Sequence, residues 1–175
     1  MTSEQATLAI TDASTLGEAK RFVADSALRG TQCQCCGRVV KVRRRYLNAP
    51  MLIVLVILEN VVRGGSENYV HVPSVIADTP WLSAEVRASV RGDWAKMVHF
   101  GLIEKHAKRR AGYWRISHMG REFVAGRTRI LKCVHMFDKK AVVVADALSE
   151  TVSLEDVLHE AGWDLGAMLV PRSPS

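Results

Sequence analysis

Four cysteines are the side chains in this 175-residue chain best suited to binding a metal ion. Three lie in the segment Cys33-Gln34-Cys35-Cys36-Gly37, and the fourth, Cys133, is followed two residues later by His135. A Cys-x-x-Cys-Gly segment is typical of half a zinc knuckle, because a tight turn lets two thiolates converge on one ion and glycine allows the backbone to turn. Structural zinc takes four ligands, so we predict a zinc site formed by Cys33, Cys36, Cys133 and His135.

Two alternatives to this ligand set remain open. Cys35 can replace one member of the first pair, or the thiols can stay partly buried without a metal. Cys133 and His135 would share a face of a strand, and a tetrahedral site accepts that arrangement only at a strand end. A disulfide framework is not favoured, because three of the cysteines are too close together to pair easily and no export signal is recognisable.

Basic side chains gather in three parts of the chain, which favours contact with a polyanion. One is an arginine run before residue 46, another surrounds a helix expected at residues 93–100, and the third is a turn expected at residues 107–112. Lys and Arg bind nucleic acid chiefly by neutralising phosphates. We expect the nucleic-acid contacts to come from Arg43, Arg44, Arg45, Arg87, Arg91, Lys96, His99, Lys105, Lys108, Arg109 and Arg110.

The charge is distributed unevenly along the chain. In total, 24 Lys and Arg stand against 18 Asp and Glu, a formal charge of +6. Residues 141–170 contain six acids and no Lys or Arg, which leaves 23 bases against 12 acids on residues 1–140. This asymmetry indicates a basic working domain and an acidic C-terminal segment that packs on it or shields it. Basic charge attracts nucleic acid and acidic protein surfaces alike.

The elements that must position these residues are short, apart from one apolar helix. The run 49–58 is uncharged and too short for the ~20 residues of a membrane span, so it predicts a buried central helix with Asn48 as its N-cap. Trp94, Phe100, Trp114 and Phe123 follow element periods and are expected in the core. The expected order is a helix at 51–62, a strand at 69–72, a helical segment at 74–90, a helix at 93–100, a hairpin at 102–116 and a helix at 118–125.

This order is that of a winged helix-turn-helix core, so the predicted fold class is α+β. We expect four parts: a leader and helix at 1–30, a cysteine knuckle and basic arm at 31–47, a winged-helix domain at 48–126, and a C-terminal β segment with an acidic helix at 127–175. In such a domain the helix before the wing lies in the major groove, and the wing reaches the phosphate backbone or minor groove.

Two segments also carry a resemblance to known families: Trp94-Ala95-Lys96-Met97-Val98-His99-Phe100-Gly101-Leu102-Ile103, and residues 112–124 with Ser117 before a short helix. Their pattern resembles the core of MarR-type regulators. The region from about Thr31 to Phe137 is closer to small winged-helix proteins of phages and mobile elements. In those proteins a Cys-x-x-Cys-Gly knuckle and a basic arm ending in Leu-Asn, here Leu47-Asn48, precede the core. The resemblance implies a fold and a viral or mobile origin, without a particular target.

The favoured function is therefore non-enzymatic binding of double-stranded DNA in a regulatory role, and a homodimer is possible. The alternative is a phage-type inhibitor or adaptor that binds a host protein, which the acidic segment favours. No phosphate loop, Gly-x-Ser-x-Gly, His-Glu-x-x-His or Gly-x-Gly-x-x-Gly motif occurs. The N-terminus has no basic region followed by a long apolar run, so we expect a cytoplasmic protein of a bacterial or phage-infected cell without a membrane anchor.

Overall fold

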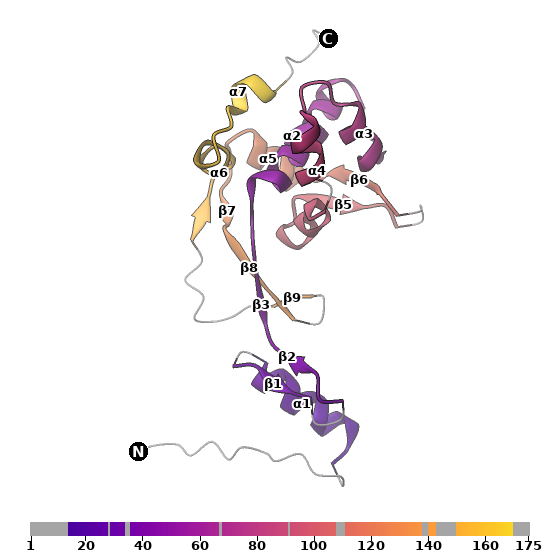
Figure 1. Cartoon of the computed structure of the whole chain (residues 1–175), viewed down its shortest axis with the longest axis vertical. Coiled ribbons are helices and arrows are strands. Elements are labelled where there is room, and N and C mark those ends of the chain that lie inside the picture. The colour runs from indigo at the N-terminus through magenta and orange to yellow at the C-terminus, as the bar shows by residue number, and fades with distance from the viewer. Residues whose placement is uncertain are drawn as a thin grey trace. The chain divides into compact units, whose positions relative to one another are not determined.

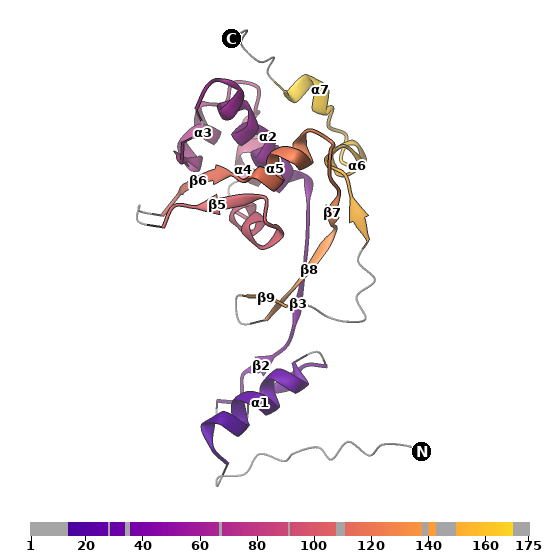
Figure 2. The same cartoon turned by 180° about the vertical axis from the view of Figure 1, so that it is seen from behind.

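The computed structural model describes residues 14–27, 29–33, 36–66, 68–90, 92–107, 111–137, 140–142 and 150–169. The fold mixes helices and strands, as the α+β prediction requires. The chain divides into two compact units, one of Met1–Arg44 with His135–Val144 and one of Arg45–Val134 with Ala145–Ser175. Figures 1 and 2 show their elements from opposite sides. Among the described residues, no helix has the length and apolar character needed to cross a membrane.

The first unit contains helix α1 (Leu16–Ser26) and a hairpin of β1 (Thr31–Gln32) and β2 (Val39–Val40). Thr15 and Glu18 cap α1 reciprocally: the Glu18 amide donates to Thr15 Oγ1 at 3.3 Å, and the Thr15 amide donates to Glu18 Oε2 at 2.7 Å. The Thr15 amide and the Thr15 hydroxyl both donate to the Glu18 carboxylate, and these two bonds lower the pKa of Glu18 because they favour its ionised form. Helix α1 therefore begins at a capping box.

The second unit is built around α2 (Ala49–Arg63), whose nine consecutive residues from Met51 to Glu59 are all buried. The Met51 amide donates to Asn48 Oδ1 at 3.0 Å, so the predicted N-cap is confirmed. Fully burying one Leu, Ile or Val side chain stabilises a fold by about 1.5–3 kcal/mol, whereas an exposed ion pair contributes about 0–1 kcal/mol. Burial of α2 therefore dominates the stability of this unit.

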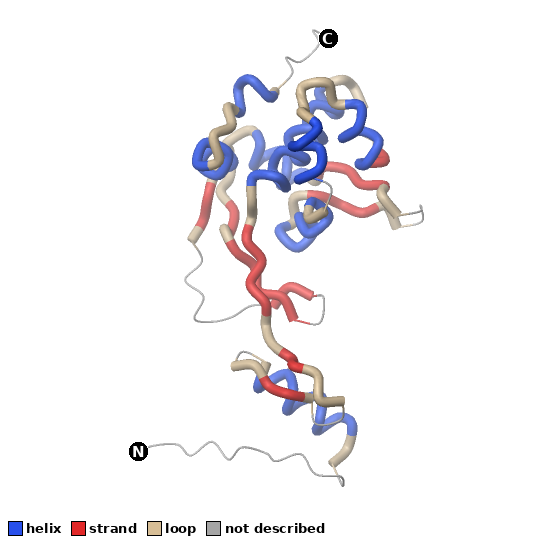
Figure 3. The backbone as a smooth tube through the Cα atoms, in the orientation of Figure 1, coloured by secondary structure: helices blue, strands red, loops and turns tan. Residues whose placement is uncertain are grey.

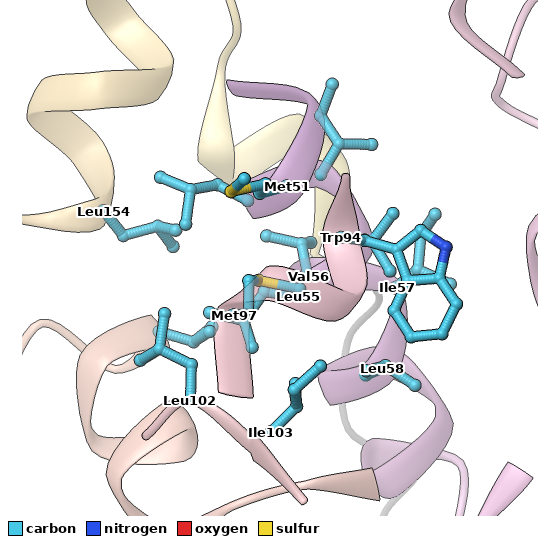
Figure 4. Packing of buried hydrophobic residues seen from close by; sticks show 14 of the residues in the cluster. Met51, Leu55, Val56, Ile57, Leu58, Trp94, Met97, Leu102, Ile103 and Leu154 are labelled. Carbon is cyan, nitrogen blue, oxygen red and sulfur yellow. The ribbon is translucent and has the colours of Figure 1, made fainter. Parts of the chain in front are cut away.

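Short helices surround α2 and bury its different faces. They are α3 (Val72–Asp78), α4 (Ala84–Val90), the 3₁₀ helix η1 (Trp94–Phe100), α5 (His118–Val124) and α6 (Leu154–Glu160), each of which contacts α2. Figure 4 shows Met51, Leu55 and Leu58 of α2 together with side chains from η1, β5 and α6. Trp94, Phe100, Trp114 and Phe123 are all buried, as expected.

A three-stranded antiparallel sheet of order β4-β6-β5 completes the second unit on one side (Figure 3). Its strands are β4 (Val70–His71), β5 (Ile103–Lys105) and β6 (Tyr113–Ile116). In β6, Trp114 and Ile116 are buried and Arg115 is exposed, the alternation of a strand with one face on a core. The β5–β6 hairpin extends away from the helices in both views (Figures 1 and 2).

The remaining strands belong to two further sheets. One is β7 (Ile130–Leu131) paired antiparallel with β10 (Thr151–Val152). The other has the order β3-β8-β9 and consists of β3 (Arg43–Tyr46), β8 (Cys133–Phe137) and β9 (Lys140–Val142). The boundary between the two units falls within β3 and within β8.

The C-terminal segment is part of the core of the second unit. Leu154 and Leu158 of α6 are fully buried, and Val157 and Trp163 pack against the same cluster. The side-chain amide of Asn60 on α2 donates to the carbonyl of Met168 at the end of α7 (Leu165–Met168) at 2.9 Å. The segment therefore cannot be removed without exposing apolar surface.

Among the glycines that the structure describes, Gly120 of α5 has the least room for an added Cβ, and this predicts the effect of a substitution. A Cβ at this position would lie 2.2 Å from the Leu102 carbonyl oxygen and 2.8 Å from Ile116 Cγ1. Gly120→Ala should therefore lower the free energy of unfolding by about 1–3 kcal/mol or more, because neither the backbone nor the buried side chain can give way freely. Urea unfolding measures the change.

Gly92→Ala is the matched control, because its added Cβ meets no atom within 4 Å in the described residues. We expect it to change stability by less than about 0.5 kcal/mol. Equal stability of Gly120→Ala and wild type would contradict the packing of α5 against Leu102.

Candidate nucleic-acid interface

The segment expected to be a recognition helix forms a 3₁₀ helix, η1, and its sequence explains why. Its buried residues Trp94, Met97 and Phe100 recur every three positions, which matches the three residues per turn of a 3₁₀ helix. Val98, which an α-helical reading places on the apolar face, is 38% exposed. The Trp94 ring meets Trp114 of β6 edge to face at 5.5 Å between centroids, which holds η1 against the sheet.

The same three-residue period places Lys96 and His99 in one row along η1. Both side chains are half-buried, so their polar ends rather than their full length are accessible. Lys96 Nζ forms an ion pair with the Asp93 carboxylate at the start of η1. Lys96 must therefore give up its ion pair with Asp93 before it can bind another anion. His99 adds a ring that can donate or accept a hydrogen bond.

Arg87 is a predicted contact residue that the fold already uses. It is half-buried on α4, and its Nη2 donates to the Thr79 carbonyl at 2.8 Å, which ties α4 to the end of α3. Its Nε is buried without a hydrogen-bond partner in the described residues, and the side chain lines a hollow of about 320 Å³. Pro73, Ile76, Ala77 and Trp94 form the rest of that lining. Arg87 therefore contributes to the structure of this unit whatever else it contacts.

The outer face of the β4-β6-β5 sheet carries polar and aromatic residues that sequence reasoning did not assign to the site. Arg115 Nη2 lies 2.7 Å from Glu104 Oε2, its directly opposed partner on β5, and its guanidinium lies 4.8 Å from the centre of the Tyr69 ring. The Tyr69 ring meets His106 edge to face at 4.6 Å. The alternation of β6 could have identified this face, because Tyr113 and Arg115 are out of phase with the buried Trp114.

Two backbone hydrogen bonds hold the ends of β5 and β6 that lie next to the hairpin loop. The His106 amide donates to the Tyr113 carbonyl at 3.1 Å, and the Val72 amide donates to the Gly112 carbonyl at 2.9 Å. Lys105 is exposed at the end of β5. Lys108, Arg109 and Arg110 belong to the loop that joins these strands and lie outside the described residues, as does Arg91. The sequence therefore concentrates three bases in the connection of an extended hairpin.

Arg43, Arg44 and Arg45 lie on β3, and the first two belong to the first unit. Arg43 and Arg44 are exposed and Arg45 is half-buried. Because successive side chains of a strand alternate, Arg44 points to the face opposite that of Arg43 and Arg45. The structure thus distributes this run over two faces, and its contribution to a nucleic-acid surface stays a prediction.

The cysteine residues are distributed over both units. Cys33 and Cys36 lie between β1 and β2, with Cys33 half-buried and Cys36 exposed, while Cys133 and His135 are half-buried on β8. Cys133 belongs to the second unit and His135 to the first. Within the described residues no group of three or more His, Cys, Asp or Glu side chains is placed to hold a metal ion. The four-ligand site within one chain stays a prediction.

The acidic residues that the structure describes in the C-terminal segment are exposed, and three of them are already engaged. Asp156 Oδ2 lies 3.1 Å from Arg129 Nη2, and Glu150 Oε1 lies 3.4 Å from Lys132 Nζ. Asp164 caps α7 by accepting from the amides of Gly166 and Ala167. These pairings engage bases of the same unit, so the segment offsets local positive charge as well as contributing to the core.

Comparison with other proteins adds no assignment: no protein-family model, curated protein or solved structure matches this chain. The function must therefore be argued from the geometry described above.

Asp156 gives a prediction for the pH dependence of stability. Its pKa is lowered, chiefly by a hydrogen bond with the Ser153 side chain, then by the Ser153 amide and by Arg129. A lowered pKa in the folded state means that the ionised carboxylate adds stability above the ordinary Asp value near 4. That stability is lost as the pH falls through the folded-state pKa.

We therefore expect wild type to be more stable than Asp156→Asn at pH 6, and the difference to shrink progressively below about pH 4. Urea unfolding of both proteins across this range measures it. Glu155→Gln, an exposed neighbour in the same turn, is the matched control for loss of one negative charge. A wild-type advantage that stayed constant down to pH 2 would contradict the capping box.

Proposed function

We propose that the second unit is a winged helix-turn-helix domain that binds double-stranded DNA without catalysis. The observation that carries the proposal is the succession of α2, β4, α3, α4, η1 and the β5–β6 hairpin within one compact unit. A buried helix forms its floor, a short helix precedes the hairpin, and a connection rich in Lys and Arg joins the two hairpin strands. Each part has a counterpart in the geometry by which winged helices contact a duplex.

The hairpin connection supplies charge of the kind that phosphates require. Lys105 is exposed at the end of β5, and the sequence adds Lys108, Arg109 and Arg110 before β6 resumes at Tyr113. Flexible cations neutralise phosphates without demanding a fixed geometry, and the released counterions make such binding depend on salt. By contrast, Arg115 within β6 forms an ion pair with Glu104 and lies over the Tyr69 ring. We therefore assign phosphate contact to the connection rather than to Arg115.

The row of Lys96 and His99 on η1 suits contact with base edges. A 3₁₀ helix of seven residues presents few side chains on one row, so only a short stretch of bases can be read directly by it. Lys96 can donate to guanine acceptors once it leaves Asp93, and His99 can donate or accept. Base discrimination then rests on these two residues, and affinity rests mainly on the hairpin connection.

The central test replaces Lys108, Arg109 and Arg110 together by Ala. Because up to three phosphate contacts are lost, the slope of log K against log salt should become shallower by about 0.9 per contact, at most about 3 in total. The loss of affinity should be similar for any duplex sequence, since phosphates carry no base identity. Fluorescence anisotropy with a random duplex over a salt series measures both quantities.

A triple replacement of Arg127, Arg129 and Lys132 by Ala is the matched control. It removes the same formal charge, but these bases are already paired with Glu122, Asp156 and Glu150. Its salt slope should therefore remain close to that of wild type. If wild type binds no duplex at 50 mM salt, or if the hairpin variant keeps the wild-type slope, the DNA-binding proposal is wrong.

The second test concerns base discrimination. Duplexes that wild type selects from a random pool are compared with scrambled duplexes of the same composition. Lys96→Ala and His99→Ala should each reduce the ratio of the two affinities by about tenfold, the size expected for loss of one good base contact. Asp93→Asn should instead strengthen binding to both duplexes, because it releases Lys96 and removes a repulsive charge. If both alanine variants keep the wild-type ratio of the two affinities, η1 does not recognise the base sequence.

Binding to a basic host protein is the alternative function, and one observation favours it. The acidic residues Glu155 and Glu160 of α6 are exposed on a helix whose other face is buried in the core. A rigid acidic helix can dock on a positive surface. If the duplex experiments above contradict DNA binding, binding to a basic protein becomes the favoured function.

A further inference from the structure

The segment from Arg38 to Arg44 in the first unit is strongly basic and is called the arm below. Its bases are Arg38, Lys41, Arg43 and Arg44, and all four are exposed. Residues 26–58 contain no Asp or Glu, although six Lys and Arg lie between residues 29 and 45. The arm therefore presents positive charge to solvent from a stretch of sequence without acids.

The backbone of the arm is held at several points. Strand β2 pairs antiparallel with β1, and the Cys33 amide donates to the Arg38 carbonyl at 2.9 Å. The Val42 amide donates to the Ala27 carbonyl, just beyond α1, at 2.8 Å. The last two residues of the arm lie on β3, which belongs to a three-stranded sheet. A backbone that is ordered in advance loses less conformational entropy when its side chains bind a partner.

The length of the arm suits the backbone of a nucleic acid. Each residue of an extended chain adds about 3.3 Å, so the distance from Arg38 to Arg44 is at most about 20 Å. One strand of B-DNA carries a phosphate every ~3.4 Å of helix axis, and about six phosphates lie within that distance. The four cations of the arm can therefore each contact a different phosphate.

The directions of the side chains favour a duplex over a flat anionic surface. Arg43 and Arg44 are both exposed and point to opposite faces of β3, because successive side chains of a strand alternate. A flat surface, such as a membrane of anionic lipids, meets one face of a strand. A groove of a duplex is bordered by a phosphate backbone on each side, so cations on both faces can be neutralised.

We propose that the arm is a second contact with double-stranded DNA, in which it lies along a groove and its four bases bind phosphates. The choice of duplex DNA rests on the proposed function, which assigns a duplex to the second unit. The arm adds affinity without base recognition, because phosphates carry no base identity. Since both units belong to one chain, binding by one raises the effective concentration of the other at the same duplex.

The arm variant tests this contact by replacing all four bases with Ala in the full chain. The slope of log K against log salt for a random duplex should become shallower by about 0.9 per contact, at most about 3.6 in total. The ratio of the affinities for selected and scrambled duplexes should stay at the wild-type value, unlike in Lys96→Ala and His99→Ala. Fluorescence anisotropy over a salt series measures both quantities.

Two further variants are matched controls. Lys20→Ala combined with Arg21→Ala removes two exposed bases from α1 of the same unit, where Arg21 already interacts with the Glu18 carboxylate. The salt slope of this variant should remain close to that of wild type. Replacing the three arginines of the arm by Lys keeps every charge and should also retain the wild-type slope, because neutralisation of phosphates depends on charge.

Chemical modification of wild type tests the same contact without any substitution. Acetylation by an amine-reactive reagent, followed by peptide mass spectrometry, should be slower at Lys41 when a duplex is bound. Lys20 is exposed on α1 and should react at the same rate with and without DNA. This comparison decides the question even if the arm variant does not fold.

The possible outcomes separate this inference from the proposed function. If the hairpin variant has a shallower slope and the arm variant does not, the arm contact is wrong and the second unit remains the DNA-binding unit. If only the arm variant has a shallower slope, the arm contact stands and the hairpin assignment is wrong. If wild type binds no duplex, both are wrong.

Two other results would overturn the arm contact. One is equal acetylation of Lys41 in the free protein and in the protein bound to a duplex. The other is an arm variant that binds duplexes like wild type but no longer binds vesicles of anionic phospholipid that wild type binds. That result would make a membrane surface the partner of the arm.

Discussion

The burial of α2 is the constraint on which the rest of the second unit depends. Its nine buried residues in succession leave no face for water, so every side of the helix must be covered by another element. The chain meets this requirement with short helices rather than long ones, and with α6 from far along the sequence. The core therefore includes the acidic C-terminal segment, whose charges face outward while Leu154 and Leu158 face inward. Hydrophobic burial of this extent outweighs the surface ion pairs around it.

The same constraint determines the form of the candidate recognition element. The seven residues of η1 bury Trp94, Met97 and Phe100 against α2 and Trp114, so η1 has a period of three residues. The same period places Lys96 and His99 in one polar row. Close packing continues at Gly120, where α5 approaches the Leu102 carbonyl so tightly that a methyl group does not fit. The hairpin that follows η1 is thereby anchored where β5 begins.

Ion pairs divide the basic residues into those that the fold already uses and those available to a partner. Arg115, Arg127, Arg129 and Lys132 each contact an acid of the same unit, and Arg87 donates to a backbone carbonyl. The positive charge available to bind a polyanion is therefore smaller than the net charge of residues 1–140. Lys105 is exposed at the end of β5, and Lys96 becomes available when it leaves Asp93, so the candidate surface is narrower than the composition implies.

Local signals in the sequence determined the element order, the caps and the buried character of α2. Asn48, Ser117 and Ser153 accept hydrogen bonds from the first turns of their helices, as short-range capping chemistry requires. Apolar periodicity likewise identified Trp94 and Trp114 as core residues. Only the tertiary structure decided that η1 is a 3₁₀ helix, that Arg87 is tied to Thr79, and that Arg115 lies between Glu104 and Tyr69. Each of these features depends on contacts between different elements of the fold. A periodicity within one element does not encode such contacts, because the partner that satisfies a side chain comes from another element.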